Sequence, residues 1–216
     1  MIEDKIILYH GSEQILKTPE FGKGEANNDY GQGFYCTKNK GLAGEWAVLW
    51  TGMDGYINEY SFDYTDLKVL YLNQMPVENW IAVLLGNRKI SSLEDFSLRI
   101  NTFLRKYSID ISEYDVIEGW RANDAFFSYV TDFVLNTLSL ENLKWALKFG
   151  DLGNQICLKS KKAFDVIEFT SYHPAPVSRF LKSARDRDLA AKQKYRQMSR
   201  KAVGTLLEDF IGRENL

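Results

Sequence analysis

Leu8-Tyr9-His10-Gly11-Ser12 is followed, after a polar stretch, by Asp29-Tyr30-Gly31-Gln32-Gly33-Phe34-Tyr35-Cys36-Thr37. Each segment reads as a short apolar strand with a polar tip that contains glycine. Each also carries one ring that can contact a ligand, His10 in the first and Tyr35 in the second. Gly11 has no side chain, so its backbone N–H and C=O can approach a planar group closely. The two segments therefore predict a binding site at the ends of two strands.

The bulk composition is that of one globular domain. The chain has 216 residues, of which 45% are hydrophobic, and a formal net charge of -2. That length allows a sizeable core, and the charge gives no overall nucleic-acid signal. Two cysteines and two histidines without a close-spaced ligand motif predict no metal site. The N-terminus lacks a signal peptide, and no apolar run reaches the roughly 20 residues that span a bilayer. We expect a cytoplasmic protein with no membrane contact.

The expected elements fall into four blocks. Early strands are predicted at 5–9, 33–37, 56–62 and 68–72, with a loop over 17–32 and a helix over 40–50. The middle, from Pro76 to Phe149, has helical spacing, with helix starts near Pro76, Ser92, Phe126 and Ser139. Late strands are predicted at 155–159 and 164–170, with a break over 173–176. The tail from 178 to 215 reads as helix.

This order predicts an α+β fold on one β-core, with helices segregated from strands. Residues 1–178 form the expected domain, which contains a mostly helical insertion over about 76–150. Residues 179–216 form a C-terminal helical extension, and 179–201 hold nine Lys or Arg against Asp186 and Asp188, a net of +7. That basic segment is either a solvated helix face or a surface for an acidic partner, with nucleic acid the lesser option.

The two opening motifs resemble those of the ADP-ribosyltransferase superfamily, in the branch that uses a histidine, a tyrosine and an acid. Poly-ADP-ribose polymerases show a similar Trp/Tyr-His-Gly-Ser motif and a similar Gly-x-Gly-Ile/Phe-Tyr motif, followed by a helix as at 41–50. Such enzymes bind NAD and cleave its nicotinamide–ribose bond. The resemblance implies a split β-core and an NAD site, with NAD as substrate and no metal.

The resemblance also implies a role for each matching residue. Gly11 would hold the nicotinamide carboxamide through its backbone, with the Ser12 hydroxyl beside it. His10 would bind a ribose hydroxyl, and the Tyr35 ring would stack on nicotinamide. Tyr30 is a second candidate wall for the same site.

The third motif of the superfamily is an acid at the start of a late strand. It stabilises the positive charge that develops on the ribose as nicotinamide leaves. The best match here is Gly153-Asn154-Gln155-Ile156-Cys157-Leu158, which has Gln155 at that position. A glutamine can hold a ribose hydroxyl, but it contributes only a dipole. Glu118 and Asp124 are candidates to replace the acid.

The whole layout further resembles a little-characterised bacterial family with an ADP-ribosyltransferase-like fold, over residues 5–172. The shared features include Asp115-Val116-Ile117-x-Gly119-x-Arg121-Ala122-x-Asp124 and Gln155-Ile156-x-x-Lys159-Ser160. The first of these is either a solvated loop between helices or a part of the cleft. In the second case Arg121 would bind the NAD phosphates as a bidentate donor.

Two functions follow as expectations. The first is a mono-ADP-ribosyltransferase that transfers ADP-ribose from NAD to a protein or nucleic-acid acceptor, as a bacterial toxin or defence effector. The second is a non-catalytic module that binds NAD or ADP-ribose, or a partner in a toxin–antitoxin pair. The basic segment 179–201 would then suit a cognate antitoxin or another acidic partner. Gln155 is the residue that favours the second function.

Overall fold

The structure is a computed structural model that describes residues 5–88, 96–122, 124–149, 153–197 and 204–211. Within these ranges the side chains of 124–126, 147–149, 191, 194–197 and 211 are not described. The predicted helix start at Ser92 lies outside the described residues. Helices and strands occur together, so the α+β class is confirmed.

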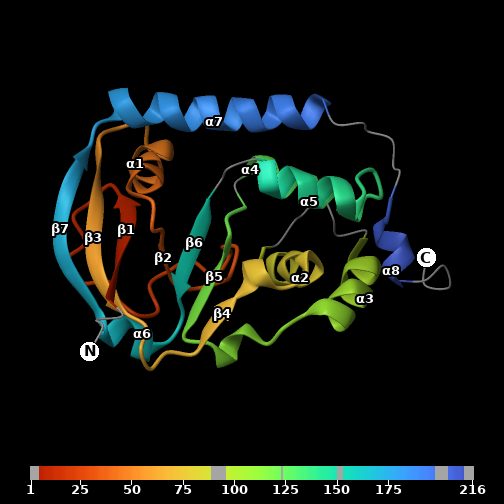
Figure 1. The fold of residues 1–216 in the computed structure, drawn as a ribbon, viewed down its shortest axis with the longest axis horizontal. Coiled ribbons are helices and arrows are strands. Elements are labelled where there is room, and N and C mark those ends of the chain that lie inside the picture. The colour runs from red at the N-terminus through yellow and green to blue at the C-terminus, as the bar shows by residue number, and fades with distance from the viewer. Residues whose placement is uncertain (1–4, 89–95, 123, 150–152, 198–203, 212–216) are drawn as a thin grey trace.

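The strands form two sheets (Figure 1). One sheet is antiparallel and has the order β1-β3-β7, with β1 Lys5–Ser12, β3 Gly55–Asp63 and β7 Ile167–Ala175. The other has the order β2-β6-β5-β4, with β2 Phe34–Cys36, β6 Asn154–Leu158, β5 Val116–Trp120 and β4 Val69–Tyr71. Its β4–β5 pair is parallel, whereas its other two pairs are antiparallel.

A bridge between Tyr9 and Thr37 joins the two sheets where the opening motifs meet. The backbone N–H of Tyr9 donates to the carbonyl of Thr37 over 2.8 Å, and the N–H of Thr37 donates to the carbonyl of Tyr9 over 2.9 Å. Helix α1, Lys40–Leu49, begins just after this bridge, and the Asn39 side chain accepts a hydrogen bond from the Leu42 N–H. Helix α1 packs against β1, so the bridge and the helix together fix how β1 and β2 meet.

The helices of the middle block pack beside the second sheet. They are α2 Val77–Asn87, α3 Ser97–Tyr107, α4 Asp124–Val134 and α5 Leu140–Phe149, with short 3-10 turns η1 Leu72–Gln74 and η3 Ile111–Glu113. Trp80, Phe103 and Phe133 are fully buried at their centre. The Ser139 hydroxyl accepts from the Asn142 N–H, as its predicted capping role requires.

The prediction that residues 115–124 connect two helices is wrong, because Val116–Trp120 forms strand β5. This strand lies between β4 and β6, and its first four residues are buried. Polar neighbours such as Asp115 disguise it in the sequence. The Asp115 side chain accepts hydrogen bonds from the Lys68 N–H and the Ser160 hydroxyl, and so joins the ends of three neighbouring segments.

The predictions for residues 161–176 also need correction. Residues 161–165 form a short helix, α6 Lys161–Asp165, which the Ser160 side chain caps at the Ala163 N–H. Strand β7 then continues through the predicted break as far as Ala175, and Pro174 pairs with Tyr56. Strand β7 is at the edge of its sheet, where the missing N–H of a proline costs no ladder hydrogen bond.

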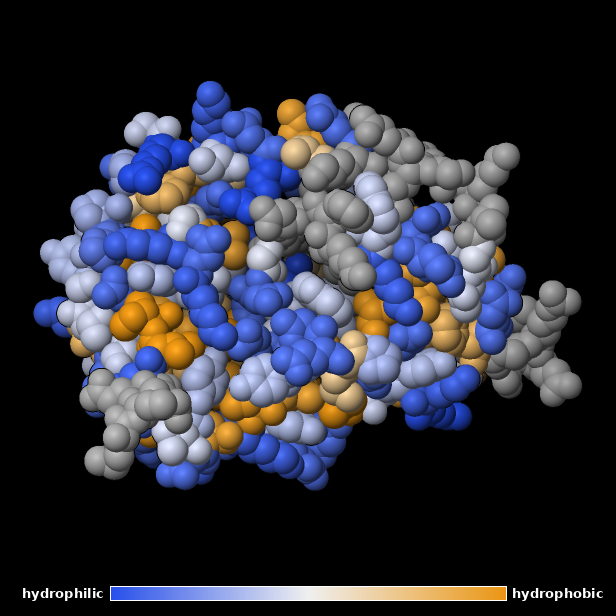
Figure 2. Space-filling model, viewed as in Figure 1, coloured by the Kyte–Doolittle hydropathy of each residue, from blue (hydrophilic) through white to orange (hydrophobic). Residues whose placement is uncertain are grey.

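The tail is not one continuous helix. Helix α7 covers Val177–Gln197, and α8 covers Leu207–Ile211. Residues 204–206 before α8 are not helical. Helix α7 packs on α1, α4 and α5 (Figure 1), and the Arg187 guanidinium forms two hydrogen bonds with the buried Glu45 carboxylate on α1. Figure 2 shows hydrophilic residues gathered over α7 along the upper edge. The predicted basic segment 179–201 is described only up to residue 197.

No helix among the described residues combines the length and the apolar character needed to cross a lipid bilayer. Cys36 and Cys157 are both buried and free.

Candidate functional site

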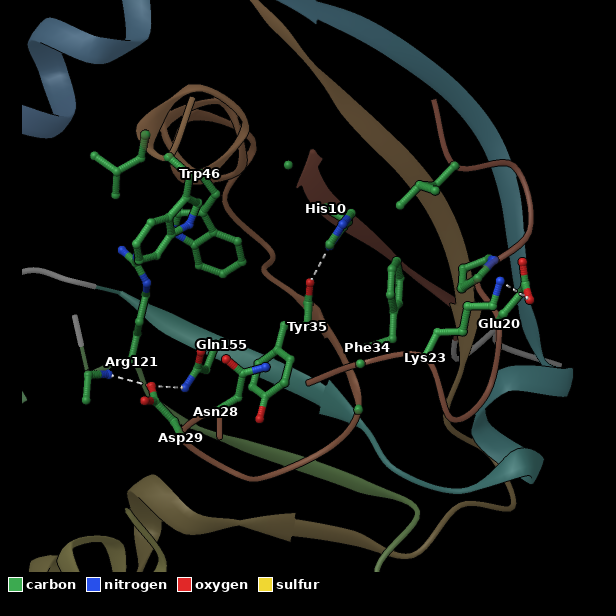
Figure 3. Close-up of a pocket in the computed structure, with 18 of the residues that line it drawn as sticks. His10, Glu20, Lys23, Asn28, Asp29, Phe34, Tyr35, Trp46, Arg121 and Gln155 are labelled. Atoms are coloured by element: carbon green, nitrogen blue, oxygen red, sulfur yellow. Dashed lines mark hydrogen bonds and ion pairs between the residues drawn. The ribbon is translucent and has the colours of Figure 1, made fainter. Parts of the chain in front are cut away.

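A cavity of about 480 Å³ is lined by residues from both sheets, from α1 and from the loop before β2. His10 and Gly11 reach it from β1, Tyr35 from β2 and Gln155 from β6, while Arg121 follows β5 (Figure 3). Its volume lies in the range of small-molecule sites. These five predicted site residues, up to 145 positions apart in the chain, therefore line one cavity.

His10 is held in one orientation. Its Nδ1 lies 2.7 Å from the Tyr35 carbonyl oxygen, which can only accept, so Nδ1 carries the proton and Nε2 is left as an acceptor. The ring packs on Phe34 with centroids 4.4 Å apart. Burial lowers the pKa of the imidazole, and the hydrogen bond to Tyr35 opposes this shift. A neutral His10 is thus prepared to accept a hydrogen bond from a hydroxyl group.

A pH experiment tests this neutral state. Because the folded pKa of His10 lies below the ordinary imidazole value of 6.5, the unfolded chain takes up the proton first as the pH falls. The contribution of neutral His10 to the free energy of unfolding is therefore complete above pH 6.5 and is lost as the pH falls through the folded pKa. We expect the unfolding free energy of wild type, minus that of His10→Asn, to shrink between about pH 7.5 and 5.5 in urea titrations. A difference that stays constant or grows on acidification would contradict a His10 that stays neutral in the folded protein.

Tyr35 has its ring at the cavity and its hydroxyl in the loop. The hydroxyl donates to the Gly31 carbonyl over 2.7 Å and accepts from the Tyr30 N–H over 3.0 Å. Burial raises the pKa of this hydroxyl, so it stays protonated and structural. Gly31 has φ +73°, which other residues rarely adopt, so the turn that Tyr35 holds requires a glycine.

The prediction that Tyr30 forms a wall of the site is wrong. Its side chain is fully buried behind Tyr35, at a centroid distance of 6.4 Å, and it does not line the cavity. The hydroxyl of Tyr30 donates to the Trp120 carbonyl over 2.5 Å. Tyr30 therefore belongs to the core between the loop and β5, where a buried phenol finds its hydrogen-bond partner.

Gly11 lines the cavity, but helix α1 also requires a glycine there. A Cβ at this position would lie 1.8 Å from the Ala43 carbonyl oxygen. The backbone groups of Gly11 have a second constraint. In antiparallel pairs the peptide groups of alternate residues point to the same edge, and those of Tyr9 bond to Thr37 rather than to β3. The N–H and C=O of Gly11 therefore also point away from β3.

Ser12 does not line this cavity. Its hydroxyl donates to the Gln14 carbonyl and accepts from the Asn58 side chain. Asn58 is fully buried in β3, and its side chain also bonds the Gln14 carbonyl and the Leu16 N–H. Sequence reasoning missed Asn58, since a single amide within an apolar strand carries little signal. Ser12 and Asn58 hold the loop that forms one wall of the cavity.

Gln155 contacts a carboxylate that the sequence analysis did not select. Its Nε2 donates to Asp29 Oδ2 over 2.7 Å, and Asp29 Oδ2 also accepts from the Ala122 N–H over 2.8 Å (Figure 3). Asp29 is 6% exposed and Gln155 is 4% exposed, and both line the cavity. The amide and the carboxylate thus act as one hydrogen-bonded unit in the wall.

Two arginines set the electrostatics around Asp29. Arg88 Nη1 lies 3.5 Å from Asp29 Oδ1 and also donates to the Ala122 carbonyl. The Arg121 guanidinium lies 5.0 Å from the ring centroid of Trp46, which lines the same cavity. Burial raises the pKa of the Asp29 carboxyl, while the Ala122 N–H, Arg88, Gln155 and Arg121 oppose that shift. The wall therefore combines one buried carboxyl group with two cations.

The structure describes the side chain of one of the two acids proposed for the cavity. Glu118 does not line it, because its carboxylate pairs with Lys38 Nζ over 3.0 and 3.2 Å. Its neighbour Gly119 pairs with Gln155 across the sheet, and successive side chains of a strand point to opposite faces. Asp124 begins α4, but its side chain lies outside the described residues.

Lys159 holds the loop that delivers Asp29 and Tyr35. Its Nζ donates to the carbonyls of Tyr30 and Gln32, over 2.6 and 2.8 Å. Burial lowers the pKa of this ammonium. The Gly31 turn is thus fixed from one side by Tyr35 and from the other by Lys159.

Comparison with known proteins gives one match. Residues 6–169 match the family described as protein of unknown function, DUF3990. No curated protein and no solved structure matches the chain. The matched segment runs from β1 into β7 and includes every cavity residue discussed above. Because it covers more than half of the 216 residues, the chain belongs to the DUF3990 family.

Proposed function

We propose that the chain is an NAD-dependent mono-ADP-ribosyltransferase with an ADP-ribosyltransferase-like split β-core. One observation carries the proposal: His10, Tyr35 and Gln155 line a single cavity, and Gln155 is hydrogen-bonded there to the buried Asp29. The resembling enzymes use a histidine, a tyrosine and an acid. The Gln155–Asp29 pair supplies both a hydrogen-bonding amide and a negative charge at the third position.

The nicotinamide end of NAD is assigned to the Gly11 side of the cavity. The N–H and C=O of Gly11 point away from β3, and a carboxamide can bond both of them in a planar arrangement. The rings of Tyr35 and Trp46 line the same cavity, so that nicotinamide can stack on an aromatic face. This binding mode selects NAD over nucleotides that lack a nicotinamide.

The ribose next to nicotinamide is assigned to His10, Gln155 and Asp29. Nε2 of the neutral His10 accepts a hydrogen bond from a ribose hydroxyl. The Gln155 side chain donates to Asp29 through Nε2, which leaves its Oε1 to accept another. As the glycosidic bond breaks, positive charge develops on the sugar, and a carboxylate in a low-dielectric site stabilises it. Asp29 supplies that charge in this proposal.

The phosphates are assigned to the cationic part of the wall. Arg88 and Arg121 both line the cavity, and guanidinium groups recognise phosphates through paired N–H donors. In the transfer step, the acceptor nucleophile forms a bond to the anomeric carbon as the bond to the nicotinamide nitrogen breaks. The electron pair stays on nicotinamide, which leaves neutral, and the nucleophile releases one proton.

Two substitutions test the binding mode. His10→Ala and Tyr35→Ala remove a hydrogen bond and a stacking surface respectively, so each is expected to raise the Kd for NAD by about tenfold. Calorimetric titration measures the Kd, and NAD at a large excess over Kd should raise the melting temperature of wild type. His173→Ala is the matched control, since His173 contacts Glu59 and does not line the cavity. Wild-type affinity for NAD in both cavity variants would show that neither His10 nor Tyr35 binds NAD.

The activity itself is tested with purified protein, NAD labelled in the adenosine half, and a cell lysate. The proposal expects label on macromolecules and an equal amount of free nicotinamide. Release of nicotinamide with label only in free ADP-ribose would make the chain a hydrolase of NAD. An intact NAD pool would refute the transferase.

A non-catalytic NAD or ADP-ribose module is the second candidate, because Gln155 stands where the resembling enzymes have an acid. The two candidates differ in what they need from the Gly11 side of the cavity. A module that senses ADP-ribose gains nothing from a carboxamide site or from Tyr35. ADP-ribose that binds as tightly as NAD would therefore favour the module, whereas a clear preference for NAD favours the transferase.

A further inference from the structure

A second pocket, of about 320 Å³, adjoins the main cavity. The two share Gly11, Leu16, Trp46 and Trp50, and the second pocket adds Ser12 at the end of β1 and Glu13 and Gln14 from the loop that follows. We propose that this pocket receives an arginine side chain of the acceptor, so that the transferred ADP-ribose is attached to a guanidinium nitrogen. This inference rests on the proposed transferase activity, and it names the acceptor that the activity requires.

Glu13 is placed at this pocket by a loop with several fixed points. On one side of it Ser12 bonds Asn58, and on the other the Gln14 carbonyl and the Leu16 N–H also bond Asn58. The Tyr60 hydroxyl donates to the Leu16 carbonyl. Asn58 and Tyr60 are both fully buried in β3. An exposed glutamate on a loop anchored in this way keeps its backbone position and can serve a bound group.

Trp50 supplies the aromatic part of the pocket. It follows the last turn of α1, and its side chain is 76% exposed although it lines both pockets. Met53 close by is 62% exposed. Because Trp50 lines both pockets, a group bound in the second pocket would contact the indole. Its flat face suits a planar cation, and tryptophan is the strongest of the aromatic side chains in cation–π contacts.

The charge of the pocket selects the acceptor. Among the described residues that line it, Glu13 is the one with an ionisable side chain. A carboxylate repels the phosphates of a nucleic acid and attracts a cation. A guanidinium can lie flat on Trp50 while its N–H fork meets the Glu13 carboxylate, whereas the compact ammonium of lysine has no flat face to stack. Arginine therefore fits the pair better than lysine.

Glu13 also accepts the proton that is released when ADP-ribose is transferred to the guanidinium nitrogen. The guanidinium nitrogen forms the new bond to the anomeric carbon, the bond to nicotinamide breaks, and nicotinamide leaves with that electron pair. The proton lost by the guanidinium passes to the Glu13 carboxylate and then to water. A general base positioned within reach of a nucleophile typically contributes about 10²–10⁴-fold in rate.

The first test compares labelling with nicotinamide release. Purified protein is incubated with labelled NAD and one of two small acceptors. Agmatine carries a guanidine group, whereas cadaverine is a diamine without one. Wild type should label agmatine and leave cadaverine unlabelled. Glu13→Gln should lower the ratio of labelled agmatine to released nicotinamide by roughly a hundredfold, and Trp50→Ala should lower the same ratio. Glu25→Gln, at an exposed position outside both pockets, is the control and should keep the wild-type ratio.

A binding measurement separates this inference from the transferase proposal. In NMR titrations of the five tryptophan indole N–H signals, agmatine should shift the Trp50 signal in wild type, with a much smaller shift in Glu13→Gln. Absence of nicotinamide release by wild type would refute the transferase, and the titration would still decide the pocket. Labelling of cadaverine instead of agmatine, an unchanged ratio in Glu13→Gln, or no shift of Trp50 would each overturn the arginine pocket.

Discussion

Asp29→Asn is expected to lower the rate of nicotinamide release from NAD by about 10²–10³-fold. The substitution keeps the shape of the side chain, and the amide oxygen can take the place of Oδ2, which accepts from Ala122 and Gln155. It removes the charge that would stabilise the developing ribose cation. NAD binding should change far less than the rate, because that cation forms only in the transition state. Single-turnover assays and calorimetric titration measure the two effects separately.

Two further variants show whether the effect belongs to Asp29. Glu118→Gln neutralises another poorly exposed acid, whose carboxylate pairs with Lys38 away from the cavity, so it should retain most of the rate. Gln155→Glu would place a second carboxylate against Asp29, where like charges resist joint ionisation, so no rate increase is expected. A rate gain in Gln155→Glu, or a wild-type rate in Asp29→Asn, would show that Asp29 does not supply the charge.

Gly11→Ala is expected to destabilise the fold by about 3 kcal/mol, at the upper end of typical overpacking costs. The new methyl carbon would lie 1.8 Å from the Ala43 carbonyl oxygen and 2.7 Å from the Ala47 nitrogen, so α1 must move away from β1. For a chain of this size the loss corresponds to a fall of roughly 6–12 °C in melting temperature. Calorimetry and urea unfolding measure it.

Gly86→Ala is the matched control for this prediction. Gly86 lies in α2, and an added Cβ there meets nothing within 4 Å. Alanine at a helical position should stabilise the fold by about 0.5–1 kcal/mol. If Gly11→Ala were as stable as wild type, the close packing of α1 on β1 would be wrong, and with it the position of Trp46 in the cavity.

Much of the fold was predictable where the local pattern agrees with the tertiary structure. Residues 5–9, 56–62 and 68–72 are dense in strand formers, and all three lie within or around observed strands. The helix over 40–50 has both apolar spacing and a capping residue, Asn39. Strand β5 escaped notice because Glu118 and Gly119 interrupt a short apolar run. Its strand conformation comes from pairing with β4 and β6, which no local window contains.

The site divides in a similar way. The shared position of His10, Tyr35, Arg121 and Gln155 was predictable from the motifs, although each residue lies on a different part of the fold. Asp29 was overlooked because an aspartate two residues before a glycine in a polar loop has the ordinary signature of a turn. Its partner Gln155 is 126 residues away. The burial that makes this carboxyl important arises only when the loop, β6 and the segment after β5 meet.

The errors over Tyr30 and Glu118 have one physical cause. Tyr30 directly follows the cavity residue Asp29, and Glu118 precedes the cavity residue Arg121 by three positions, so sequence proximity suggested a shared site. Their side chains do not line the cavity. The Tyr30 hydroxyl donates to the Trp120 carbonyl in the core, and the Glu118 carboxylate accepts from Lys38. In a strand or a tight turn, neighbours along the chain face different surroundings.

The central claim, that this cavity binds NAD for cleavage, is tested most directly by a crystal structure of the Asp29→Asn variant with NAD. We expect the nicotinamide carboxamide on the backbone N–H and C=O of Gly11, with the nicotinamide ring against Tyr35. We also expect a ribose hydroxyl at His10 Nε2 and the phosphates near Arg121. NAD bound outside the cavity, or bound in it with the adenine at Gly11, would contradict the account.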